Sequence, residues 1–170
     1  DQGWRFHLGE IPFPEAKTVG ESYGWGWAKA GAFQGAARPE FNDSSWRQVD
    51  LPHDWAVEGI FSLDAGPSHG YLPTGVAWYR KTFFLPARHE GRRLYLEFEG
   101  IFRNATVFLN GHRLGHEPSG YISFHYDITD QAIYGDENVL AVHVDATEGE
   151  GWWYEGAGIY RHVWLTITDE

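Results

Sequence analysis

A two-residue hydrophobic period, recurring from residue 76 to the end of the chain, constrains the fold more than any other feature. In 92–99, for example, Leu94, Leu96 and Phe98 occupy alternate positions. Side chains of a strand point alternately to the two faces of a sheet, so this pattern predicts a half-buried strand. No long segment has the 3.6-residue period of an amphipathic helix. The chain is therefore expected to be all-β.

Turn residues separate the predicted strands. A hairpin is expected between 105–109 and a strand starting at His112, because Asn110-Gly111 readily adopts the positive φ angles of a two-residue turn. Further strands are predicted at 4–8, 76–85, 121–128, 138–144 and 162–168. The pattern indicates a single domain spanning residues 1–170. Its predicted architecture is a jelly-roll β-sandwich of roughly eight antiparallel strands in two facing sheets.

Strand patterns are weaker in the first third of the chain. We interpret 15–38, which is rich in glycine and alanine, as a long loop with one short helical turn. A second helical turn is predicted at 41–46, where Asn42 or Asp43 offers a side-chain oxygen as a cap. Leu51-Pro52 then begins an extended piece, since proline disfavours helix in the residue before it.

Charge and composition narrow the possible partners. Lys and Arg number 13 against 24 Asp and Glu, which gives a net charge of −11. Phosphate binding needs a basic face, so neither nucleic acid nor an anionic membrane surface is expected as a partner. No apolar run approaches the ~20 residues of a membrane span. The start at Asp1, without Met or a signal-peptide pattern, favours a mature or excised chain of periplasmic or secreted origin.

Aromatic residues are abundant, at 17% of the chain with nine tryptophans. A flat ring can lie against the apolar face of a sugar, so aromatic side chains in loops are candidate sugar contacts. The tryptophans in glycine-rich loops are Trp25, Trp27, Trp152 and Trp153. The tryptophans next to predicted strands and turns, which are expected in the core, are Trp4, Trp46, Trp55, Trp78 and Trp164.

Catalytic motifs are weak. Asp145, Glu148, Glu150 and Glu155 cluster in sequence, and a retaining glycosidase needs two carboxyls ~5 Å apart, but a solvated acidic loop is the alternative. Either His53 and Asp54 orient each other, or His53 is a structural histidine. There is no cysteine, nucleophile elbow, metalloprotease motif or phosphate loop. We therefore expect no metal site and no cofactor.

A series of short motifs extends over nearly the whole chain. They are NDSSWR at 42–47, VDLPHDW at 49–55, GYLP at 70–73, WYRKTF at 78–83, LEFEGI at 96–101, RNATVFLNG at 103–111, PSGY at 118–121, YDIT at 126–129, WY at 153–154 and GAGIYRHV at 156–163. In order and spacing they resemble glycoside hydrolase family 2. The resemblance is nearest to the β-galactosidase branch, with β-glucuronidase and β-mannosidase as relatives.

The resemblance implies an N-terminal sugar-binding domain with a galactose-binding-domain-like jelly roll, belonging to a larger retaining exo-β-glycosidase. In the family, an immunoglobulin-like domain and a catalytic (β/α) barrel follow, and both catalytic glutamates lie on the barrel. A barrel needs ~250 residues, so no catalytic residue is assigned to this chain. The implied partners are those downstream domains and a β-glycoside sugar.

The resemblance also implies that loops of this domain form part of the wall of the sugar pocket. By position, the predicted substrate-facing residues are Thr74 and Gly75 in one loop and Trp152, Trp153, Tyr154 and Glu155 in another. Two alternatives remain open. The chain could be an autonomous carbohydrate-binding module, or a structural spacer domain that has no contact with sugar.

Overall fold

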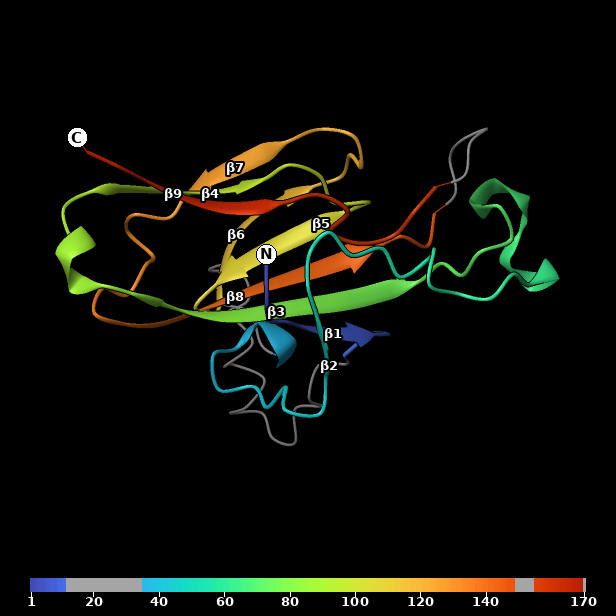
Figure 1. Ribbon diagram of the computed structural model, residues 1–170, viewed down its shortest axis with the longest axis horizontal. Helices are drawn as coiled ribbons and strands as arrows, with labels where there is room; N and C mark the ends of the chain where they lie inside the picture. Colours follow the sequence, from blue (N-terminus) through green and yellow to red (C-terminus); the bar gives the residue numbers. More distant parts are fainter. Residues whose placement is uncertain (12–34, 149–154, 170) are drawn as a thin grey trace, which may run out of the picture.

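The computed structural model describes residues 1–11, 35–148 and 155–169 (Figure 1). Within this part the fold is almost entirely β, which confirms the predicted class, with nine strands where roughly eight were expected. The strands are β1 Trp4–Leu8, β2 Arg47–Val49, β3 Val76–Leu85, β4 Arg93–Phe98, β5 Ala105–Leu109, β6 His112–Glu117, β7 Phe124–Asp127, β8 Asp136–Asp145 and β9 Val163–Thr168. The short 3-10 helices are η1 Gly35–Ala37, η2 Leu63–Ala65, η3 Pro67–His69 and η4 Ala87–His89. None of the described helices could cross a membrane.

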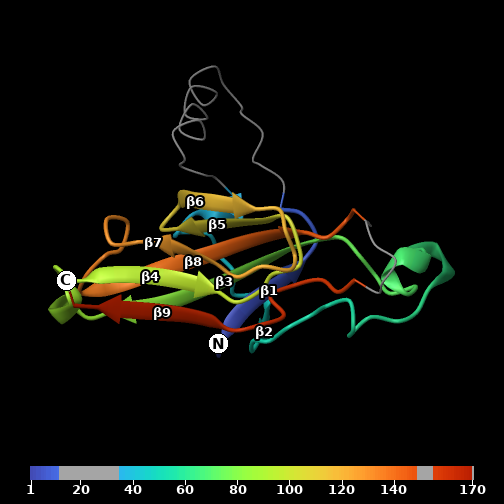
Figure 2. The same cartoon turned by 90° about the horizontal axis from the view of Figure 1, so that it is seen from above.

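The strands form two antiparallel sheets that face each other (Figure 2). A six-stranded sheet has the order β2-β1-β3-β8-β5-β6, and a three-stranded sheet has the order β7-β4-β9. The main core lies between them. Leu94, Leu96 and Phe98, the residues with the two-residue period, are buried there together with Tyr79 and Val142 of the larger sheet. Burial of these apolar side chains supplies most of the driving force for folding.

The longest ladder joins β3 to β8 over ten residue pairs, from Val76 opposite Asp145 to Leu85 opposite Asp136. The predicted strand at 76–85 is confirmed at both ends, and Pro86 ends it because proline has no N–H to donate. The predicted hairpin is confirmed as well. Asn110 and Gly111 connect β5 to β6 with φ angles of 51° and 80°, as a two-residue hairpin turn requires.

A buried arginine holds a second layer on the outer face of the larger sheet. Arg80 is only 2% exposed, and its Nε donates to Asp43 Oδ2 at 2.8 Å. Its Nη1 donates to the carbonyl oxygens of Ala36 and Arg38. The planar guanidinium thus satisfies several acceptors of one loop simultaneously. Residues 35–43 cover this face of the sheet, where a smaller apolar cluster forms around Trp78.

Two local predictions need correction. Residues 41–46 form a turn and not a helical turn: Asn42 Oδ1 accepts from the Ser44 N–H at 3.1 Å, while Asp43 binds Arg80. Trp164 is 48% exposed and not in the core, because it lies on edge strand β9 and donates from Nε1 to Glu99 at 2.9 Å.

The other tryptophans predicted in the core, Trp4, Trp46, Trp55 and Trp78, are buried as expected. Of the predicted 15–38 loop, residues 35–37 form the 3-10 turn η1. Trp25, Trp27 and the rest of that loop up to residue 34 lie outside the described residues.

We predict that Arg80→Ala lowers the free energy of unfolding by about 3–5 kcal/mol, because it leaves Asp43 and the buried carbonyl of Ala36 without their donor. Arg93→Ala is the matched control. Arg93 forms an exposed ion pair with Asp127 at 2.9 Å, so its loss should cost less than about 1 kcal/mol. Urea unfolding of both variants measures the difference. Equal losses would contradict the anchoring role of Arg80.

Candidate functional site

Loops from three parts of the chain meet at one end of the sandwich, on the right in Figure 1. His53 N–H donates to Ile159 O at 2.8 Å and Trp55 N–H donates to Ala157 O at 2.9 Å. On the other side, Ala146 N–H donates to Gly75 O at 2.9 Å. Backbone hydrogen bonds therefore fix Gly75 and the described segments on either side of residues 149–154. We call this end of the sandwich, where residues 53–55, 75, 146 and 157–159 meet, the loop rim.

The Asp54 carboxylate connects two segments of the loop rim that are far apart in sequence. Its Oδ1 accepts from Ala56 N–H and from Ala157 N–H, both at 2.9 Å. Hydrogen bonds to an ionised acceptor are among the stronger ones in proteins. Asp54 thus attaches the loop that follows β2 to the segment that leads into β9.

Gly158 lies at a close approach of the two segments. Its φ is +131°, and a Cβ atom there would lie 2.5 Å from both His53 O and Tyr79 Oη. Glycine adopts such backbone angles at little cost, and its missing side chain allows this close approach. The glycine-rich 156–158 segment is therefore a requirement of the backbone packing at Gly158.

We predict that Gly158→Ala lowers the free energy of unfolding by about 4 kcal/mol or more, since it combines a strained φ with a clash against buried backbone. Gly91→Ala is a control for the strain alone. Gly91 has φ of +85°, but a Cβ added there would have no atom within 4 Å, so about 1–2 kcal/mol is expected. Thermal or urea unfolding measures the stability of both variants. Similar losses of unfolding free energy in Gly158→Ala and Gly91→Ala would contradict the packing argument.

A buried histidine lies beneath the loop rim. His53 is 6% exposed; its Nε2 is 2.6 Å from Arg47 Nη2 and its Nδ1 is 2.7 Å from Tyr79 Oη. Arginine can only donate, so Nε2 must accept, and the proton of a neutral imidazole lies on Nδ1. His53 and Asp54 therefore have separate partners, and His53 is a structural histidine.

The polar groups around His53 have shifted pKa values. Burial lowers the pKa of His53, although the nearby Glu58 carboxylate opposes the shift. Burial alone would raise the pKa of Glu58, but a hydrogen bond and the positive charge of Arg47 outweigh it and lower the pKa. Burial also raises the pKa of Tyr79 well above its usual value. The site thus keeps a neutral imidazole next to an Arg47–Glu58 ion pair of 2.5 Å.

We predict that His53 makes stability depend on pH. The unfolded chain binds a proton at His53 below about pH 6.5, whereas in the folded protein the lowered pKa of His53 delays protonation to a lower pH. The free energy of unfolding therefore falls as the pH drops through about 6.5. His53→Gln should weaken the decline between about pH 7 and 5. Urea unfolding across this range compares the variant with the wild type. Parallel curves would show that His53 does not cause the decline.

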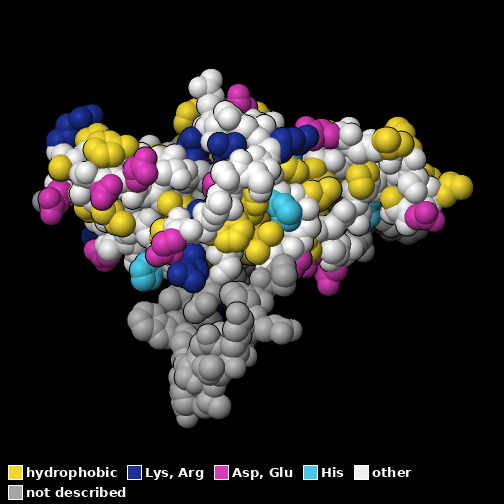
Figure 3. Space-filling model, turned by 90° about the horizontal axis from the view of Figure 1, so that it is seen from below, with side chains coloured by type: hydrophobic (Ala, Val, Ile, Leu, Met, Phe, Trp, Pro, Cys, Tyr) yellow, Lys and Arg dark blue, Asp and Glu magenta, His cyan; other side chains and the backbone are white. Residues whose placement is uncertain are grey.

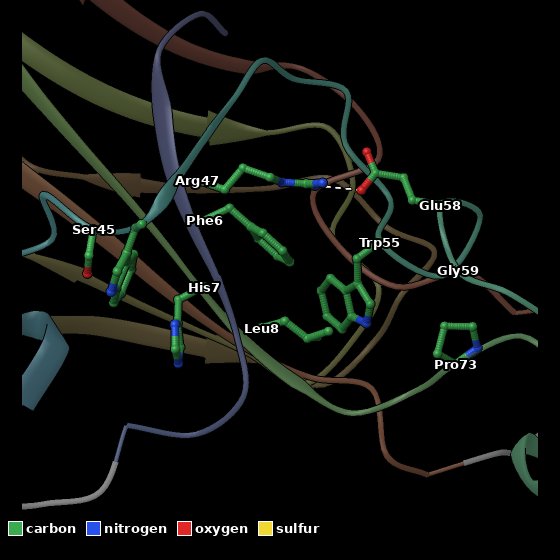
Figure 4. A pocket seen from close by; sticks show the side chains of 10 residues that line it. Phe6, His7, Leu8, Ser45, Arg47, Trp55, Glu58, Gly59 and Pro73 are labelled. Carbon is green, nitrogen blue, oxygen red and sulfur yellow. Dashed lines mark hydrogen bonds and ion pairs between the residues drawn. The ribbon is translucent and has the colours of Figure 1, made fainter.

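A groove of about 400 Å³ opens beside the loop rim, lined by Phe6, His7, Leu8, Ser45, Trp46, Arg47, Trp55, Glu58, Gly59 and Pro73. Figure 4 shows Phe6, Leu8 and Trp55 directed toward its centre, with the Arg47–Glu58 ion pair along one side. Arg47 also lies over the Phe6 ring, 5.2 Å from its centroid. Sequence reasoning missed this groove because four separate segments form it and its rings looked like ordinary core residues.

The described residues of the predicted site lie in two loops at the loop rim. Thr74 and Gly75 are half-buried immediately before β3. Glu155 is buried, and its Oε2 is 3.4 Å from Nε2 of the equally buried His69. The His69–Glu155 contact joins the loop of Glu155 to the loop that leads through Leu72 to Thr74. Trp152, Trp153 and Tyr154 lie outside the described residues, so the substrate-facing role of the set stays a prediction.

The acidic cluster is divided among separate partners. Asp145 Oδ1 accepts from the N–H and hydroxyl of Thr147, at 3.0 and 2.6 Å. Glu148 is exposed and 3.5 Å from Arg103, and Glu155 faces His69. Glu150 lies outside the described residues. Among residues 1–11, 35–148 and 155–169, no group of three His, Cys, Asp or Glu side chains is placed to hold a metal ion.

Comparison with known proteins agrees with this architecture. Residues 72–156 match the family model described as glycosyl hydrolase 2 galactose-binding domain-like. The chain belongs to this family. It is 45% identical over 97% of its length to the β-galactosidase BoGH2A of Bacteroides ovatus, and 31% identical over 94% to a β-glucuronidase of Formosa agariphila. Among solved structures, a β-glycosidase from Bacteroides vulgatus superposes with a TM-score of 0.80, at 38% identity over 99% of the chain.

These relatives are much longer than the chain. It spans 17% of the B. ovatus protein, 18% of the F. agariphila protein and 20% of the B. vulgatus structure. The chain therefore corresponds to one domain of the multidomain proteins it resembles. The family and the predicted fold class are thus confirmed.

Proposed function

We propose that this chain is the non-catalytic, N-terminal carbohydrate-binding domain of a larger retaining exo-β-glycosidase that acts on β-galactosides. The observation that carries the proposal is the 45% identity, over 97% of the chain, to a protein named as a β-galactosidase. Identity to relatives named as β-glucuronidase or putative β-glucuronidase is lower, at 41% over 76% of the chain, 36% over 73% and 31% over 94%. A glucuronide is therefore the competing substrate class.

In this proposal the catalytic groups are supplied by a (β/α) barrel of the longer protein, which an immunoglobulin-like domain separates from this chain. The acidic side chains here support that division. Asp145 is occupied by Thr147, and Glu155 is buried against His69. A retaining glycosidase needs two carboxyls on either side of one glycosidic bond, and these two have different local roles.

The contribution of this chain would be to wall part of the sugar pocket. Thr74, Gly75 and Glu155 lie on loops that meet at the loop rim. Asp54 Oδ1 accepts from Ala157 N–H and Gly75 O accepts from Ala146 N–H, which keeps those loops in place. Fixed polar groups at a pocket wall orient the non-reducing sugar. Orientation matters because a small displacement of a bound substrate can cost a large part of the rate.

The groove lined by Phe6, Trp46 and Trp55 favours a second candidate, an autonomous carbohydrate-binding module. It combines aromatic side chains with the Arg47–Glu58 ion pair, and polar groups beside rings are typical of sugar sites. This candidate requires the 170-residue chain to bind sugar by itself. The wall proposal requires a contribution from the neighbouring domain.

The test uses Thr74→Ala in the full-length protein that contains this chain. Losing one hydroxyl hydrogen bond to the sugar, about 1 kcal/mol, should raise the KM for a nitrophenyl β-galactoside about five-fold. Thr166→Ala, at an exposed position of strand β9, is the matched control and should leave KM unchanged. An unchanged KM for both variants would instead support a structural spacer.

Two further measurements separate the remaining candidates. The full-length protein should hydrolyse the β-galactoside with a higher kcat/KM than the β-glucuronide, and the 170-residue chain alone should hydrolyse neither. Titration of the isolated chain with galactose, followed by tryptophan fluorescence, should give no change. Saturable binding would favour the autonomous module.

A further inference from the structure

The loop between β2 and β3 presents a row of apolar side chains to solvent. Val57, Ile60, Phe61 and Leu63 are between 67% and 88% exposed, and Tyr71 from the same loop is 41% exposed. We call these five residues the apolar crest. In Figure 3 hydrophobic side chains reach the right-hand tip of the molecule, the end formed by η2 and η3.

The apolar crest belongs to an internally bonded loop. Ser62 N–H donates to Tyr71 O at 2.8 Å, and Tyr71 N–H donates to Gly66 O at 3.0 Å. Nearer to β2, Gly59 N–H donates to Ala56 O at 3.0 Å. These bonds cross-link the loop, so the backbone holds the apolar side chains outward. Their exposure is a property of the folded loop.

The apolar crest is continuous with the groove beside the loop rim. Glu58 and Gly59, which line the groove, lie between crest residues in the sequence, and Pro73 lies against Gly59. Leu8, on the groove's far side, is 53% exposed. An extended apolar surface of this kind is typical of an interaction site. The acidic side chain that lines the groove, Glu58, forms an ion pair with Arg47. The pair leaves little net charge there, which suits an apolar partner.

We propose that the apolar crest is the docking surface for another domain of the same polypeptide, which covers it with an apolar face. This inference rests on the proposed function, in which the chain is one domain of a larger glycosidase. Its relatives are about five times longer than the chain, so most of their residues are available to form such a face. The crest also lies at the end of the sandwich that holds Thr74 and Glu155. A domain that completes the sugar site must approach from there.

Single cysteines test this proposal, because the chain itself contains none. F61C and L63C are introduced into the full-length protein, and labelling of each thiol by N-ethylmaleimide is followed by mass spectrometry of the peptide that carries it. F84C is the matched control. Phe84 is 61% exposed but lies at the opposite end of β3 from the crest. All three replaced side chains are exposed, so the variants should fold.

We expect F61C and L63C to react at least about tenfold more slowly than F84C in the native full-length protein, because thiol reactivity depends on exposure. In urea, and in the 170-residue chain alone, the three thiols should react at similar rates. Equal rates in the native full-length protein would overturn the proposal. Slow labelling in the isolated chain, together with a dimer in sedimentation, would also overturn it and identify a second copy as the occupant.

The outcome is independent of which glycoside the protein hydrolyses. Protection of F61C is read from labelling, whereas the proposed function is read from turnover of the β-galactoside. A protein that protects the apolar crest but does not hydrolyse the β-galactoside would contradict the proposed function and leave the docking surface supported. Hydrolysis without protection would contradict the docking surface alone.

Discussion

The ten antiparallel pairs between β3 and β8 hold the other parts of the molecule in place. One face of β3 places Tyr79 in the core, where its hydroxyl meets His53. The opposite face places Arg80 against the 35–43 layer. At the start of the strand, Gly75 O binds Ala146 N–H at the loop rim, and at its end Leu85 O binds Gly135 N–H. The core on one face of β3, the 35–43 layer on the other face and the loops at both ends of the strand are therefore attached to the β3–β8 pair.

The predictions that held were those that depend on local sequence. The period of two at Leu94, Leu96 and Phe98 reports which face of a strand is buried, and Asn110-Gly111 reports a turn from two residues alone. The prediction for Trp164 failed because burial depends on the sheet's edges and on what covers each face. A strand's own sequence does not contain that information.

The candidate site also depends on contacts between distant residues, which the local sequence does not predict. Family resemblance predicted Thr74, Gly75 and Glu155 as substrate-facing residues in two loops, and that role stays a prediction. The resemblance did not predict that Glu155 is buried against His69, or that Asp54 accepts a hydrogen bond from Ala157. Both contacts join residues more than about 80 positions apart. Neighbouring residues in the sequence do not reveal such pairs, and the groove between Phe6, Trp46 and Trp55 was missed for the same reason.

The Asp54–Ala157 bond has a consequence for biosynthesis. Its two residues are separated by 103 positions, and Asp1 likewise binds Val163 N–H across 162 positions. A ribosome must therefore make nearly the whole domain before either contact can form. Contacts between such distant residues also fold slowly, because the intervening chain must lose much of its freedom first. During translation the β3–β8 ladder can assemble before residue 157 is made, so the loop rim and strand β9 are completed after it.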